Sequence, residues 1–80
     1  MTKQIKYAAD FERFARKVQK NIKRLRKEKG LSQEDLMDYD ISLRTIQRIE
    51  QEKEPVNITL LTLKRLSKAF KIKTSDLLDV

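Results

Sequence analysis

The side chains that could do chemistry in this sequence are mainly basic. Lys and Arg number 19 against 12 Asp and Glu, which gives a formal net charge of +7 and points to a polyanionic partner. Arg44 and Arg48 are four residues apart, so on a helix both would point to the same side. Each planar guanidinium can donate two parallel hydrogen bonds, a geometry that suits a phosphate or the edge of a guanine base.

Catalytic chemistry has little to work with in this chain. The sequence contains no His and no Cys, so the usual general base, the thiol nucleophile and the commonest zinc ligands are missing. A hydrolase would have only carboxylates. We therefore expect no enzyme, no cofactor and no metal site. No apolar run approaches the roughly 18 residues of a membrane span, and the sequence begins without a signal-peptide pattern, so we expect a cytoplasmic protein.

Amphipathic helices are the elements expected to position these basic side chains. The 80 residues include one Gly and one Pro, too few for a chain of hairpin turns, which favours an all-α fold. A helix is predicted over about residues 11–29, with Asp10 as its N-cap and Gly30 after its end. Its apolar stripe is Phe11, Phe14, Ala15, Val18, Ile22 and Leu25. Residues 1–9 are expected to form a flexible basic arm, and residues 10–80 a single domain.

Two short helices are predicted after Gly30. Ser32 and Asp35 fit a capping box for a helix over about 33–38. Ser42 can cap the next helix, over 43–52, which would bury Ile46 and Ile49. Both boundaries follow from local hydrogen-bonding chemistry.

The remaining residues predict a core helix and a closing turn. The core helix begins at Asn57 or Thr59, and the closing turn, capped by Thr74 or Ser75, ends near Leu78. The apolar stripe of the core helix is Leu60, Leu63, Leu66 and Phe70.

The positive charge is unevenly distributed along the chain. Residues 1–29 hold 11 basic and 3 acidic side chains, residues 30–56 hold 3 and 7, and residues 57–80 hold 5 and 2. The basic face of the first helix could follow a nucleic-acid backbone or simply keep a long helix solvated. Both interpretations are compatible with the sequence.

Four blocks of the sequence resemble, in order, the lambda-repressor-like (Cro or XRE type) helix-turn-helix DNA-binding family. They are LRKEKGLSQEDL, ISLRTIQRIE, TLKRLSKAF and SDLL, at residues 25–36, 41–50, 62–70 and 75–78. The resemblance extends over about residues 18–78. It implies a compact five-helix domain with an extended first helix and a helix-turn-helix at about residues 33–52, whose second helix enters the major groove.

The resemblance also implies roles for individual side chains. Those expected to contact bases are Leu43, Arg44 and Arg48. Those expected to contact the DNA backbone are Gln33, Ser42, Thr45 and Gln47. Arg26 and Glu50 are expected to form an internal ion pair that fixes the recognition helix to the first helix.

The function implied is that of a bacterial or phage transcriptional regulator, most simply a repressor. It would bind double-stranded DNA at a palindromic operator as a homodimer, and would be associated with the nucleoid. Leu77, Leu78, Val80 or the Phe11 end could form the dimer contact. The alternative is an antitoxin or accessory protein whose main role is to bind a protein partner, for example through the Phe11 and Phe14 end of the first helix.

The sequence departs from the family pattern on both sides of the predicted recognition helix. The preceding turn is one residue shorter and has Asp40 where Gly is usual. The following loop, residues 52–56, is about two residues longer and has no Gly. Both departures bear on the angle of the recognition helix and on phosphate contacts from the loop.

Overall fold

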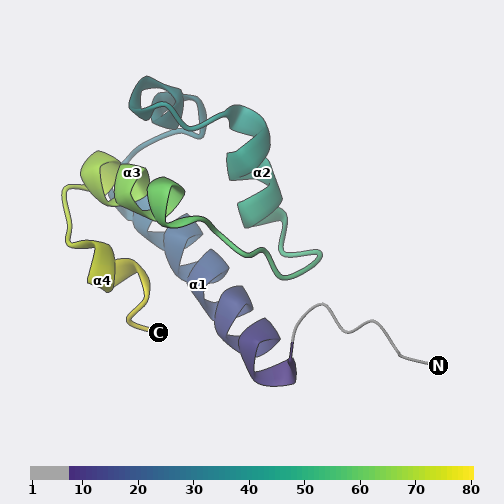
Figure 1. Cartoon of the computed structure of the whole chain (residues 1–80). Coiled ribbons are helices and arrows are strands. Elements are labelled where there is room, and N and C mark those ends of the chain that lie inside the picture. Colours follow the sequence, from purple (N-terminus) through teal and green to yellow (C-terminus); the bar gives the residue numbers. More distant parts are fainter. Residues whose placement is uncertain (1–7) are drawn as a thin grey trace.

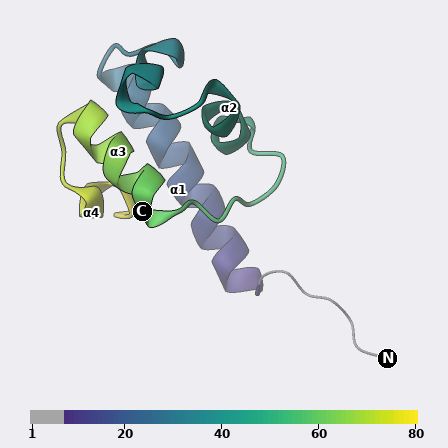
Figure 2. The same ribbon diagram turned by 45° about the horizontal axis from the view of Figure 1, so that its top comes forward.

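A long helix, α1 (Ala9–Glu28), supports the other elements in the computed structural model, which describes residues 8–80. These elements are η1 (Glu34–Tyr39), α2 (Leu43–Gln51), α3 (Leu60–Phe70) and α4 (Thr74–Leu77). Figures 1 and 2 both show α2 on one side of α1, with α3 and α4 on the other. The described part of the chain contains helices and no strand, so the predicted all-α, five-helix fold is confirmed.

One apolar core joins the five helices. Its members come from every helix and from the turn before α2: Val18, Ile22, Leu36, Ile41, Ile46, Ile49, Leu63, Leu66, Ala69, Phe70 and Leu77. Burying a side chain of this size contributes about 1.5–3 kcal/mol relative to exposing it. The first turns of α1 extend beyond this core, because Phe14 remains 43% exposed.

Most of the predicted helix boundaries are confirmed by hydrogen bonds. The Ser32 hydroxyl accepts from the Asp35 amide at 3.0 Å, and the Asp35 carboxylate accepts from the Ser32 amide at 2.8 Å. Ser42 accepts from the Thr45 amide, and Thr59 from the Thr62 amide, both at 3.1 Å. The helix predicted at 33–38 is a 3-10 helix, and the helix predicted at 43–52 ends at Gln51.

Two predicted N-caps are wrong. The first helix begins at Ala9, and Asp10 lies inside its first turn, where a carboxylate is favoured by the helix dipole. The remaining residues assigned to the arm, 1–7, lie outside the described part. The last helix begins at Thr74, so Lys73 occupies the cap position, and its amide donates to Asp76 Oδ2 at 3.1 Å. The Thr74 hydroxyl is instead hydrogen bonded to that of Ser67.

Candidate nucleic-acid interface

The side of α2 that faces away from the core carries polar residues. Ile46, Ile49 and Glu50 are buried, so the opposite side of the helix presents Arg44 and Arg48 to solvent. Gln47 and Gln51 are also exposed. Leu43, at the first position of α2, is half-buried.

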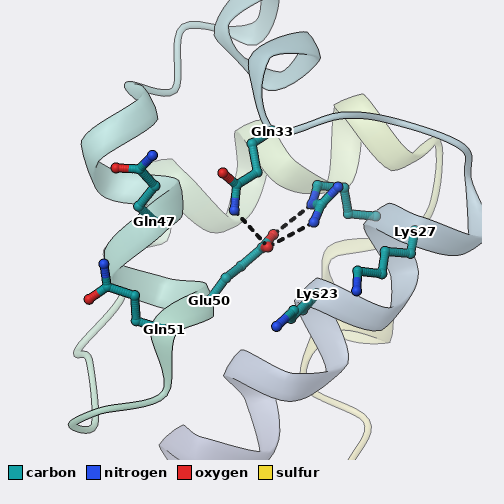
Figure 3. A pocket seen from close by; sticks show the side chains of 7 residues that line it. Lys23, Lys27, Gln33, Gln47, Glu50 and Gln51 are labelled. Carbon is teal, nitrogen blue, oxygen red and sulfur yellow. Dashed lines mark hydrogen bonds and ion pairs between the residues drawn. The ribbon is translucent and has the colours of Figure 1, made fainter.

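A buried ion pair attaches α2 to α1. Arg26 Nε donates to Glu50 Oε2 at 2.7 Å, and Arg26 Nη2 donates to Glu50 Oε1 at 2.9 Å (Figure 3). The two residues are 8% and 5% exposed. Gln33 Nε2 donates to the same Glu50 Oε1 at 3.0 Å, and Arg26 Nη1 donates to the Leu31 carbonyl at 2.7 Å. One carboxylate therefore joins α1, the start of η1 and α2.

This network keeps the Glu50 carboxylate ionised. Burial alone would raise its pKa, but hydrogen bonds from Arg26 and Gln33 and the charges of Arg26 and Lys23 outweigh burial and lower the pKa below its ordinary value. The hydrogen bond to Glu50 likewise raises the pKa of Arg26, against the opposing effect of burial. Both partners are thus charged at neutral pH, and their charges cancel within the site.

A polar hollow of about 530 Å³ lies between α1 and α2 beside this ion pair. We call it the lysine hollow; its lining residues are Lys23, Arg26, Lys27, Gln33, Gln47, Glu50 and Gln51. Figure 3 shows the two lysines coming from α1 and the glutamines Gln47 and Gln51 from α2, with Gln33 between them. Because Arg26 neutralises Glu50, the two ammonium groups give the hollow a net positive charge.

A second hollow, of about 160 Å³, lies on the α3 side of α2. We call it the threonine hollow; its lining residues are Thr45, Arg48, Ile49, Val56, Asn57, Ile58, Thr59 and Thr62. Its hydroxyl, amide and guanidinium groups are hydrogen-bonding partners suited to phosphate oxygens. The exposed side of α2 is therefore bordered by a hollow on each flank.

Comparison with known families identifies this arrangement. The model of the lambda-repressor-like, Cro-type helix-turn-helix family matches residues 22–77. The chain belongs to this family. Its members are DNA-binding domains without enzymatic activity. No curated protein and no solved structure gives a match.

In this helix-turn-helix domain, the side chains expected at the interface occupy distinct places. Gln33 and Gln47 line the lysine hollow, and Thr45 lines the threonine hollow. The Ser42 hydroxyl is occupied, because it caps α2 and donates to Thr45 Oγ1 at 2.8 Å. The ion pair that the family resemblance implied for Arg26 and Glu50 is present.

Other residues of the two hollows were missed at the sequence level. Gln51 could have been found, since it is seven residues after Arg44 and so shares its side of the helix. Lys23 and Lys27 are part of the long basic face of the first helix, and the sequence does not indicate which part of this face lies next to α2. For Asn57 the sequence predicts only a helix start.

The described residues contain neither a metal-binding cluster nor a membrane-spanning helix. Among them, no group of three His, Cys, Asp or Glu side chains could hold a metal ion. None of the helices in residues 8–80 is long and apolar enough to cross a membrane.

Proposed function

We propose that this helix-turn-helix protein is a sequence-specific regulator of transcription, most simply a repressor, that reads the major groove of double-stranded DNA with α2. The observation that carries this proposal is the exposed side of α2, with Arg44 between the two hollows and Arg48 at the edge of the threonine hollow. The major groove is about 12 Å wide and admits one helix. A phosphate strand borders the groove on each side, so each hollow would receive one strand.

The chemistry of α2 suits base recognition. Arg44 and Arg48 can each donate a pair of hydrogen bonds to O6 and N7 of guanine. Leu43, at the start of the helix, can offer an apolar contact to a thymine methyl group. These three side chains are our candidates for contacts that specify sequence.

The two hollows suit the DNA backbone. In the lysine hollow, Lys23 and Lys27 would neutralise phosphates while Gln33 and Gln47 donate hydrogen bonds. In the threonine hollow, Thr45 would contact the other strand. Ser42 would contribute mainly by fixing the start of α2.

Binding-site selection from random duplexes at a stated salt concentration tests the proposal. We expect enrichment of a short motif containing guanines, and a palindrome if two copies bind together. Recovery of random sequences, with equal affinity for all of them, would contradict sequence-specific regulation.

We also propose that the protein binds a palindromic operator as a homodimer. Supporting this, Leu60 and Leu61 at the start of α3 are 82% and 57% exposed, and paired half-sites about 34 Å apart are typical of this class. Leu77 cannot contribute to the dimer contact because it is fully buried. Sedimentation with and without operator DNA should give two protein chains per palindrome; one chain per operator would contradict the dimer.

A second candidate function, binding and controlling a protein partner, is favoured by one observation. An apolar groove of about 160 Å³ lies beside the exposed Phe14, and its other lining residues are Ala15, Val18, Val56, Ile58, Leu63 and Leu78. Such a protein would act as an antitoxin or accessory factor. A Phe14→Ser variant that binds DNA normally but no longer co-purifies with a partner would support this function; co-purification of no partner with the wild type would contradict it.

The lysine hollow gives a prediction for the salt dependence of binding. Changing Lys23 and Lys27 together to Gln should make the slope of log K against log salt shallower by up to about 2 units, with the preferred sequence unchanged. The matched control changes Lys17 and Lys20 to Gln. These two lysines lie beside Asp79 and Val80 rather than beside α2. Equal slopes for the two double variants would remove the lysine hollow from the DNA footprint.

A further inference from the structure

Two turns flank α2, and each contains a residue other than Gly in the left-handed conformation. Asp40, in the turn before α2, has φ of 65°, and Glu52, directly after α2, has φ of 60°. A side chain at such a position brings its Cβ close to the following carbonyl oxygen, which disfavours the conformation. A contact from elsewhere in the fold would therefore stabilise these turns.

An arginine from another helix holds each turn by the backbone of its left-handed residue. Arg65 Nη1, from α3, donates to the Asp40 carbonyl at 3.1 Å, and Arg65 Nη2 lies 3.3 Å from Asp40 Oδ2. Arg16 Nη1, from α1, donates to the Glu52 carbonyl at 3.1 Å. The third left-handed residue that is not Gly is Lys71, which directly follows α3 rather than flanking α2, and it has no such arginine in the described chain.

Gln19 reinforces the second of these turns. Its side chain is fully buried, and Nε2 donates to the carbonyls of Ile49 and Glu54 at 2.9 and 3.3 Å. Gln19 Oε1 accepts from the Val56 amide at 3.0 Å. The end of α2 and the loop after it are thus fixed to α1 through their backbone.

We propose that Arg16 and Arg65 are positioning residues of the DNA-binding site. They hold the two left-handed turns and so set the orientation of α2, without themselves touching DNA. This inference rests on the proposed function, because orientation matters only if α2 reads bases. A tilt of this nine-residue helix would move Arg44 and Arg48 away from the base edges while leaving the positive charge of the domain in place.

A double-mutant cycle of Arg16→Met and Glu52→Gly tests the proposal. The quantity to measure is the ratio of affinities for the selected duplex and for a random duplex. Arg16→Met is expected to lower this ratio about 3- to 10-fold, a change that corresponds to the net free energy of about one hydrogen bond. Adding Glu52→Gly should restore most of the ratio, because Gly adopts positive φ without a Cβ penalty.

Arg13→Met is the matched control. Arg13 is exposed and lies one turn before Arg16 on α1, and its side chain makes no hydrogen bond or ion pair within residues 8–80. Loss of its charge should weaken binding to both duplexes equally, and so leave the ratio unchanged. An equal ratio for the two arginine variants, or no recovery with Glu52→Gly, would overturn the positioning role.

Hydrogen exchange without DNA, and the duplex preference of the wild type, separate this inference from the proposed function. Without DNA, Arg16→Met should speed hydrogen exchange of the Val56 amide, measured where the variant is folded. If Arg16→Met does not fold, Arg65→Met with and without Asp40→Gly provides the same cycle at the other turn. A wild type that prefers no duplex would contradict the proposed function; a variant that discriminates as well as a discriminating wild type would contradict only the positioning role.

Discussion

Glu50→Ala is expected to lower the free energy of unfolding by about 3–5 kcal/mol, a large part of the total for a domain of this size. Arg26 is 8% exposed, and the variant leaves its guanidinium without the carboxylate partner. A buried charge that has lost its partner retains the full cost of its desolvation. Gln33 also loses its hydrogen-bond acceptor in this variant. Urea denaturation at neutral pH measures the change in the free energy of unfolding.

A surface pair provides the matched control for this prediction. Arg24 Nη1 lies 2.6 Å from Glu28 Oε2, but both side chains are 56% exposed. Glu28→Ala should therefore lower the free energy of unfolding by no more than about 0.5 kcal/mol. Replacing both buried partners, as Arg26→Met with Glu50→Leu, should recover most of the stability lost in Glu50→Ala. Similar denaturation midpoints for Glu50→Ala and Glu28→Ala would show that the buried pair is not a structural support.

The same carboxylate predicts how stability depends on acid. The pKa of Glu50 is lower in the folded protein than its ordinary value of 4.5, so between these two values the unfolded chain binds more protons. The stabilisation that ionised Glu50 contributes to the folded protein is therefore fully present above pH 4.5. It is lost as the pH falls through the lower pKa that Glu50 has in the folded state. Wild-type stability should fall more steeply over this range than that of the Arg26→Met, Glu50→Leu variant. Parallel curves would contradict the role of Glu50.

Local chemistry explains which parts of the fold could be predicted from the sequence. The apolar stripe of α1, the left-handed Gly30 and the caps at Ser32, Ser42 and Thr59 depend on residues within one helical turn of one another. The exposure of Arg44 follows from helical periodicity in the same way. The N-cap prediction at Asp10 is wrong because carboxylates are favoured both at the cap and in the first turn of a helix.

Contacts between distant segments explain what could not be predicted. Gln19 and Arg16 resemble ordinary polar residues of a basic helix, yet their partners lie 30 or more residues later. Nothing near Lys23 indicates that α2 lies beside it. Such roles depend on which distant segments of the chain pack against each other, and the single sequence contains no signal for these contacts. The Arg26 and Glu50 pair, 24 residues apart, came from the family resemblance alone.

Arg48→Ala is expected to weaken binding to the selected duplex by about 1–3 kcal/mol and to relax the preference at one base pair. Arg48 is exposed on α2 and lines the threonine hollow, so its guanidinium can reach either a base edge or a phosphate. A guanine contact would leave affinity for random duplexes nearly intact. Selection repeated with the variant should therefore return the wild-type motif with one position degenerate.

Two controls distinguish the base contact from a contribution of charge. Arg48→Lys keeps the charge but loses the planar pair of donors, so it should lose selectivity at the same base pair while binding random duplexes normally. Lys53→Ala removes one exposed charge from the loop after α2, and should weaken binding to all duplexes alike. If Arg48→Ala behaves like Lys53→Ala and Arg48→Lys like the wild type, Arg48 contacts phosphate, and Arg44 becomes the only arginine of α2 that can specify a base.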